Sequence, residues 1–226
     1  MTVPSSASTH RPWQVYVEPV ARNEWPESEW TGRGATGFGL HGSVSRCAVI
    51  ALLNGTHPAT GTLLGRAFRE SGSHRGSAPS VRGFNATFNA PKSVSVLWAA
   101  ADARTRDEII HGHRAAVRAV LSYVERTTSS RARAADEADP LPLPIVGITA
   151  ATLHLHVSGS GDPHLHSVAL ITTKVRTLDS RWLALDARPL MREQQTLSRL
   201  YHAALQGELA SRLARSCCCF GAGLGC

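Results

Sequence analysis

One stretch of this sequence decides its fold: Leu153-His154-Leu155-His156-Val157-Ser158-Gly159-Ser160-Gly161-Asp162-Pro163-His164-Leu165-His166-Ser167. Histidine and apolar residues alternate on both sides of a Ser-Gly-Ser-Gly-Asp-Pro cluster. This pattern predicts a β-hairpin with a loop of several residues. Because side chains at i and i+2 share one face of a strand, each strand presents its two histidines together.

The four histidines of this hairpin form a candidate metal site. If both pairs, His154 with His156 and His164 with His166, lie on one face of the hairpin, up to four imidazoles converge. Neutral imidazole is the commonest nitrogen ligand and favours Ni, Cu, Zn or Mn-type ions over Ca. The alternative is two solvated strands that carry histidine by chance. Four of the 11 histidines fall within this hairpin, which favours the metal site.

The composition fits one large domain with a polyanionic partner. The chain has 226 residues and a formal net charge of +7, which suits nucleic acid without requiring it. Neither a membrane-spanning apolar run nor an apolar signal core is present, so we expect a cytoplasmic protein. Cys47 is the only cysteine before Cys217, which argues against a disulfide scaffold.

The pattern of elements predicts an α+β fold, an antiparallel β-sheet with helices packed on one side. The glycine-rich segment from Trp30 to Gly42 is expected to be a loop, because glycine disfavours helix interiors. Helices are expected over residues 44–53, from about 90 to 101, from a Thr105 capping box to about Arg126, and over 191–213. Strands are expected over residues 83–88, 145–157, 164–175 and 181–185.

Apolar periodicity also predicts the core. Its expected members are Phe84, Phe88, Val94, Trp98 and Leu197, together with a stripe on the helix that follows Thr105: Ile110, Val117, Val120, Leu121 and Val124. His111 and His113 lie two residues apart on that helix and therefore diverge. We expect them to be solvated or packed rather than to act as ligands.

The chain divides into three parts. Residues 1–29 form a poorly specified N-terminal lead-in, in which Trp13, Val15 and Val17 are candidates for a short strand. Residues 30–215 form the main domain. Residues 216–226 form an atypical Cys/Gly tail, which suggests a truncated or frame-shifted end.

Several segments of the domain resemble the relaxase domain of conjugative relaxases of the TrwC/TraI (MobF) type. The most specific blocks are Gly83-Phe-Asn-Ala-Thr-Phe-Asn-Ala-Pro-Lys-Ser-Val-Ser-Val-Leu-Trp98 and Gly161-Asp-Pro-His-Leu-His-Ser167. Further matches are Trp30-Thr-Gly-Arg-Gly-Ala35, Pro58-Ala-Thr-Gly61 and Thr177-Leu-Asp-Ser-Arg-Trp182. The resemblance covers residues 30–215.

The resemblance implies a relaxase-like, His-hydrophobe-His fold and a DNA-nicking activity. In such proteins a tyrosine hydroxyl attacks a DNA phosphate and forms a covalent phosphotyrosine. A divalent ion (Mg, Mn or another ion suited to histidine ligands) neutralises charge on the phosphate oxygens. The implied partner is single-stranded DNA at a plasmid transfer origin, with other conjugation proteins as further candidates. Lys92 and Arg82 are candidate DNA-binding residues.

The sequence departs from the family pattern at its functional positions. The resemblance places Asn85 at the position of the family aspartate, and Leu155 and Val168 at the positions of the first and last histidines. His166 alone is in the family register. His154 or His156 could take the place of the first histidine only after a one-residue shift in strand register. Such a shift moves a side chain to the other face of the sheet. The tyrosine motif is missing, and Tyr16 is the weak candidate for the nucleophile.

Three functions follow from these observations. The leading interpretation is metal-dependent nicking and strand transfer of single-stranded DNA at a plasmid transfer origin, as in a conjugative relaxase. The alternative is a catalytically degenerate, single-stranded DNA-binding remnant of a relaxase, which Asn85, Val168 and the missing tyrosine motif favour. A third interpretation is a metalloenzyme that uses the histidine-rich hairpin on small substrates.

Overall fold

The computed structural model describes residues 27–69, 80–132 and 141–221. At its centre lies an antiparallel sheet with the strand order β1–β5–β6–β2. The strands are β1 (Ser28–Thr31), β2 (Gly83–Asn89), β5 (Ala150–Val157) and β6 (Pro163–Thr172). The predicted histidine-rich hairpin is therefore confirmed as the central pair of the sheet. Tyr16 and the strand predicted near it lie outside the described residues.

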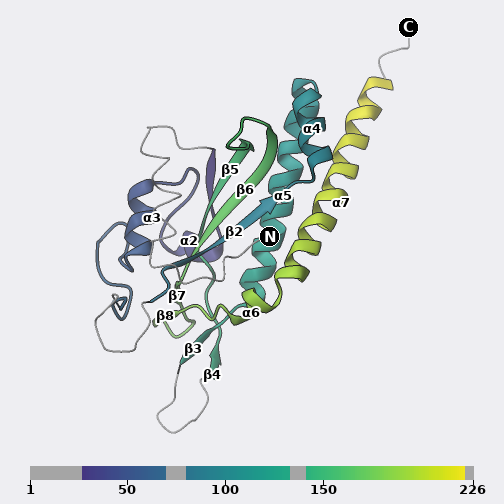
Figure 1. Cartoon of the computed structure of the whole chain (residues 1–226). Coiled ribbons are helices and arrows are strands. Elements are labelled where there is room, and N and C mark those ends of the chain that lie inside the picture. The colour runs from purple at the N-terminus through teal and green to yellow at the C-terminus, as the bar shows by residue number, and fades with distance from the viewer. Residues whose placement is uncertain (1–26, 70–79, 133–140, 222–226) are drawn as a thin grey trace.

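Two long helices cover one face of this sheet. They are α5 (Ala103–Thr127) and α7 (Gln194–Gly221), which run side by side (Figure 1). Side chains of alternate strand residues point toward them, because successive residues of a strand face opposite sides. This helix-facing side carries small and apolar residues of β2, β5 and β6: Ala86, Phe88, Ala150, Ala169 and Ile171.

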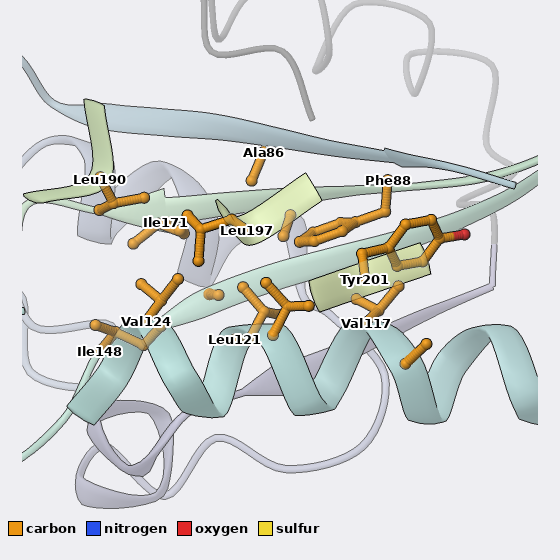
Figure 2. Close-up of a cluster of buried hydrophobic side chains, with 14 of the residues drawn as sticks. Ala86, Phe88, Val117, Leu121, Val124, Ile148, Ile171, Leu190, Leu197 and Tyr201 are labelled. Carbon is orange, nitrogen blue, oxygen red and sulfur yellow. The ribbon is translucent and has the colours of Figure 1, made fainter. Parts of the chain in front are cut away.

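The main hydrophobic core fills the space between this side of the sheet and the helices (Figure 2). From α5 it takes the predicted stripe Val117, Val120, Leu121 and Val124, all fully buried. Ile109 is buried in place of the predicted Ile110, which is half-buried. From α7 the core takes Leu197, Tyr201 and Leu205. Burial of this apolar surface is the main force that holds the helices on the sheet.

The other predicted core residues are confirmed with different degrees of burial. Phe88 and Leu197 are fully buried, whereas Phe84, Val94 and Trp98 are partly buried and pack against the core from its edge. Trp98 belongs to α4 (Lys92–Ala100), the helix predicted to follow β2. Its side chain therefore covers the core without being enclosed by it.

A smaller hydrophobic cluster lies on the opposite face of the sheet. The helix α3 (Arg46–Leu53) packs Val49 and Leu53 against Ala151 and Leu170 of the sheet. This helix was predicted over residues 44–53, and it ends as expected at Asn54, followed by Gly55 with φ 74°. Glycine adopts that left-handed conformation without steric cost.

The helix starts differ from the predicted ones. The carboxylate of Asp102 accepts a hydrogen bond of 2.9 Å from the amide of Thr105, so Asp102 caps α5 and the predicted Thr105 capping box is wrong. Aspartate is a strong N-cap residue, and Asp102 precedes the threonine in the chain. The N-cap of α4 is Pro91, so this helix begins at Lys92, two residues after the predicted start near residue 90.

The glycine-rich segment was predicted to be a loop, and this prediction is wrong in part, because residues Arg33–Gly37 form the short helix α2. The amide of Gly34 donates a 2.9 Å hydrogen bond to the carbonyl of Ile148. A Cβ on Gly34 would lie 2.7 Å from that same oxygen. The glycine thus permits the backbones to touch, and this contact outweighs its low helix propensity.

The remaining elements are short. They comprise β3 (Ser130–Ala132), β4 (Leu141–Leu143), β7 (Lys174–Arg176), β8 (Trp182–Ala184) and α6 (Arg188–Arg192). The predicted strand 164–175 is divided at Thr173 into β6 and β7, and α7 continues past the predicted end at Leu213 to Gly221. Among the described residues, no helix is long and apolar enough to span a membrane.

Candidate functional site

The register of the β5–β6 hairpin decides how its histidines are arranged. Leu155 lies opposite His166, and His154 lies opposite Ser167. Residues directly opposite each other in an antiparallel pair share one face of the sheet. His154 therefore faces the helices, whereas His166 points to the other side. The condition for a four-histidine site, that both pairs lie on one face, is not met.

We use the term open face for the side of β2, β5 and β6 that points away from α5 and α7. The pairing of Thr87 with Val168, and of Asn85 with Leu170, places these side chains on it together with Leu155 and His166. The positions at which the resemblance expects an aspartate and three histidines thus share one face. The register brings together the right positions, but three of the four carry residues other than the expected aspartate and histidines.

The histidine pair of β6 lies at the hairpin end of the open face. The rings of His164 and His166 are 4.5 Å apart between centroids. Nδ1 of His166 lies 2.9 Å from the carbonyl oxygen of His164. Burial, followed by the charges of His166 and Lys92, lowers the pKa of His164. The two imidazoles therefore lie side by side on this face, and the lowered pKa favours the neutral form of His164.

The two predicted DNA-binding residues lie in different surroundings. Lys92 is exposed at the start of α4 and donates a 3.1 Å hydrogen bond from Nζ to the carbonyl of Pro163, so its charge is next to the His164 and His166 pair. Arg82 precedes β2 and donates from Nη1 to Asn54 Oδ1 at 3.0 Å. Its guanidinium also lies 5.4 Å from the centre of the Phe68 ring.

Asn85 is the most constrained polar residue of the open face. Its side chain is 9 % exposed, and its Oδ1 atom has no hydrogen-bond partner among the described residues. A buried amide oxygen without a partner is costly, which often marks a ligand or strain site. An amide can accept a hydrogen bond at this position, but it cannot act as a general base.

The open face does not fit a three-histidine metal centre. Leu155 and Val168, which flank His166 across the sheet, have no atom that can bind a metal. Within residues 27–69, 80–132 and 141–221, no group of three or more His, Cys, Asp or Glu side chains could hold one ion. Among the described strand residues of this side, only His164 and His166 supply imidazoles.

Another predicted ligand, His154, takes part in a polar network on the helix-facing side. Nδ1 of His154 lies 2.7 Å from Ser167 Oγ, and the same hydroxyl lies 2.7 Å from Nε2 of His113. Nδ1 of His113 is 2.8 Å from the hydroxyl of Tyr201. This chain of four side chains connects β5, β6, α5 and α7 inside the core. His113, predicted to be solvated or packed, is therefore packed.

Two carboxylates of the edge strand connect this network to α5. Glu29 contacts Arg118 through both carboxylate oxygens, at 3.0 and 2.6 Å, and lies 3.5 Å from Nε2 of His154. Burial opposes ionisation of Glu29, but its contacts with His154 and Arg118 outweigh it and lower its pKa to about 2. Glu27, just before the strand, forms a second ion pair with Arg114.

His156, the fourth predicted ligand, is used for packing. Its ring stacks on Trp98, with centroids 5.2 Å apart and an interplanar angle of 25°. Burial lowers its pKa, Glu27 raises it and Arg114 of α5 lowers it. The neighbouring charges place His156 on the side of α5, away from His166. The β-bulge between Leu155 and Val157 accompanies this placement.

Comparison with known proteins identifies the relatives of this fold. The chain matches the TrwC relaxase family over residues 7–217. It belongs to this family. The TrwC relaxase domain of this chain is 31% identical over 160 residues to the multifunctional conjugation protein TraI of Escherichia coli K12. That match covers 70% of the chain and 8% of TraI, so the chain spans a small part of the length of this relative.

Solved structures of TrwC confirm the fold. A metal-bound complex of the conjugative relaxase TrwC with oriT DNA is 26% identical and superposes with a TM-score of 0.73, over 88% of this chain and 67% of TrwC. A copper-bound complex is 28% identical with a TM-score of 0.73, over 93% of this chain and 69% of TrwC. The predicted α+β relaxase fold is therefore correct.

Proposed function

We propose that this chain is a conjugative relaxase domain that binds single-stranded DNA at a plasmid transfer origin and nicks it. The observation that carries the proposal is the similarity of the whole described fold to TrwC, which was solved in complex with oriT DNA. The open face supports it, because His164, His166 and the exposed Lys92 lie together at its end. A cation beside two imidazoles suits a DNA backbone.

The proposed reaction is a transesterification. A tyrosine hydroxyl loses its proton and forms a bond to a DNA phosphorus, while the bond from that phosphorus to a sugar oxygen breaks. The sugar hydroxyl leaves with a proton, and the strand remains attached to the protein as a phosphotyrosine. Tyr16 is the candidate nucleophile; it lies within the family match and outside the described residues.

The proposed cofactor is a divalent ion, since TrwC was solved with metal bound. In this chain His164 and His166 are the candidate ligands. Because Leu155 and Val168 offer no third or fourth imidazole, we propose that the ion is held more weakly than by three histidines. His154 and His156 are assigned to packing, since their rings contact Ser167 and Trp98.

A second candidate function is single-stranded DNA binding without nicking. It is favoured by Asn85, whose amide stands where the family pattern expects a carboxylate. Nicking depends on groups that act as a unit, and the loss of one member usually removes much of the rate. DNA binding depends on distributed cationic contacts and does not require these groups.

A nicking assay separates the two functions. Labelled single-stranded oligonucleotides that tile the DNA flanking the gene are incubated with the protein and Mg²⁺ or Mn²⁺, and covalent adducts are resolved by denaturing electrophoresis. An adduct that Tyr16→Phe abolishes and Tyr123→Phe leaves intact supports the relaxase. Tyr123 is a suitable control because its hydroxyl is hydrogen-bonded to Glu193 and lies outside the site. Binding without any adduct supports the second function, and absence of binding contradicts both.

A further inference from the structure

A second candidate site lies at the other end of the fold. Residues of α2, of the β7–β8 hairpin and of the loop that precedes β5 enclose a cavity of about 240 Å³. His166 and Lys174 are separated by eight residues, which corresponds to roughly 26 Å in an extended strand. The cavity is therefore distinct from the open face around His166.

The wall of this cavity is aromatic. Phe38 stacks on Trp182, with centroids 5.2 Å apart and an interplanar angle of 18°. His57 contacts the edge of Phe38 at 5.2 Å between centroids. Gly34 and Gly147 line the cavity as well. Such a wall suits a planar, aromatic ligand.

The same cavity carries two cations. Lys174 lies opposite Ala184 and Arg176 lies opposite Trp182, so both cations share one face of the β7–β8 hairpin with the tryptophan. The side chain of Arg176 donates a 3.0 Å hydrogen bond to Ser180. This register directs positive charge and the aromatic wall toward one space.

Lys174 is unusually buried for a lysine. It is 7 % exposed, donates from Nζ to the carbonyl of Arg66, and lies 4.6 Å from the centre of the Phe68 ring. Among the described residues, no carboxylate forms an ion pair with it. A buried ammonium without a counter-charge is costly, and a bound anion would offset this cost.

We infer that this cavity binds one nucleotide of single-stranded DNA, with its base against Phe38 and Trp182 and its phosphate beside Lys174 and Arg176. Stacking of bases on aromatic rings combined with cationic contacts to phosphate is the usual way in which proteins hold single strands. The volume is below that of a pocket for a larger ligand, which suits a single nucleotide. The inference rests on the proposed DNA-binding function and adds an anchor far from the open face.

The chain offers a direct chemical test, because Lys92 and Lys174 are its only lysines. Pyridoxal phosphate carries a planar ring, a phosphate and an aldehyde that condenses with an amine, with loss of water, to an imine that borohydride reduces. Burial lowers the pKa of Lys174, which favours this reaction near neutral pH. Peptide mass spectrometry then compares labelling at the two lysines, with Lys92 as the internal reference.

We expect pyridoxal phosphate to label Lys174 several-fold faster than Lys92. Thymidine monophosphate should protect Lys174 and not Lys92, and thymidine without the phosphate should protect it much less. Equal labelling of the two lysines, no labelling of Lys174, or labelling that the nucleotide does not reduce would overturn the inference. Protection by the free nucleotide but not by an oligonucleotide would assign the cavity to a free nucleotide and overturn the DNA anchor.

A matched pair of variants tests the DNA strand itself. Arg176→Gln should weaken binding of a single-stranded oligonucleotide about fivefold or more, and Trp182→Phe should have a smaller effect. Arg104→Gln removes an exposed arginine at the start of α5 and should leave the affinity unchanged. Equal affinities of the Arg176→Gln and Arg104→Gln variants would refute the anchor while the DNA-binding function stands. If the unmodified chain binds no oligonucleotide, the proposed function fails, and the anchor of a DNA strand fails with it.

Discussion

Burial of the single residue His113 makes the stability of the folded protein depend on pH. It is buried in the middle of α5 and contacts Tyr201 and Ser167 through its two ring nitrogens. Burial, followed by the charges of neighbouring histidines, lowers its pKa to about 3. The ring is therefore neutral in the folded protein at any pH near neutrality, whereas it titrates near 6.5 in the unfolded chain.

The first prediction concerns the pH dependence of stability. Between pH 6.5 and 3 the unfolded chain binds the proton that folded His113 excludes, so its contribution is complete above pH 6.5 and is lost as the pH falls. From pH 7.5 to 5 this amounts to about 2 kcal/mol. Denaturant unfolding at both pH values should show a smaller pH effect in His113→Gln than in the unmodified chain. The exposed His111→Gln on the same helix is the control, and an unchanged pH effect in both variants would contradict the assignment.

The second prediction concerns the two apolar residues beside His166. Since Leu155 and Val168 share its face, replacing both with histidine should place two further imidazoles next to His166 on the open face. Calorimetry with Ni²⁺ or Mn²⁺ should show at least a tenfold gain in affinity over the unmodified chain. Adding His166→Ala should remove the gain, while adding His156→Ala should retain it. A double variant that binds no better would show that the backbone no longer holds these positions in ligand geometry.

At the scale of single residues, the sequence could identify the candidate histidine ligands. It could not show which face of the sheet each histidine occupies. The alternation of histidines predicts the strands, and the resemblance selects His166. Which histidine pair faces the helices depends on the register, which the five-residue turn and the bulge after Leu155 set. A shift of one residue would exchange the faces of a whole strand, so period-2 spacing alone could not decide it.

At the scale of single elements, α2 is the clearest example of tertiary contacts outweighing propensity. The third prediction is that Gly34→Ala destabilises the protein by about 2 kcal/mol, because a Cβ there would meet the carbonyl of Ile148 at 2.7 Å and force the helix off the strand. Gly37→Ala in the same helix meets no atom within 4 Å. It should leave stability unchanged or raise it by up to about 1 kcal/mol. Thermal unfolding of the two variants measures the difference, and equal melting temperatures would show that the contact with Ile148 is dispensable.

Elements with a strong apolar period were predictable, and those built on backbone contacts were not. The helix over residues 44–53 and the strand over 83–88 appear as α3 and β2 within two residues, because their apolar faces are buried as the period requires. The helix at Arg33–Gly37 could not be predicted, since its reason is a backbone hydrogen bond to a residue more than 100 positions away. The cavity lined by Lys174 and Trp182 was missed for a similar reason, because its parts are distant in sequence.

At the scale of the whole molecule, the excess of positive charge governs encounter with DNA. The chain carries 24 lysine and arginine residues against 17 acidic ones. The fourth prediction is that its affinity for single-stranded DNA falls linearly on a plot of log K against log salt, with a slope near −0.7 per phosphate contacted. Removal of one phosphate contact, as in Arg176→Gln, should make the slope shallower by about that amount. A salt-independent affinity, measured by fluorescence anisotropy between 50 and 300 mM salt, would contradict an interface built on phosphate contacts.

The strand order β1–β5–β6–β2 described above has a consequence for the order in which the sheet assembles. The central hairpin joins residues close in sequence, whereas β1 reaches β5 across a separation of 121 residues, as between Thr31 and Thr152. Closing so long a loop costs entropy before its contacts repay it. The four-residue β1 should therefore be the last strand to dock during folding. It should also open first in the native protein, so that its amides exchange with solvent sooner than those of β5 and β6.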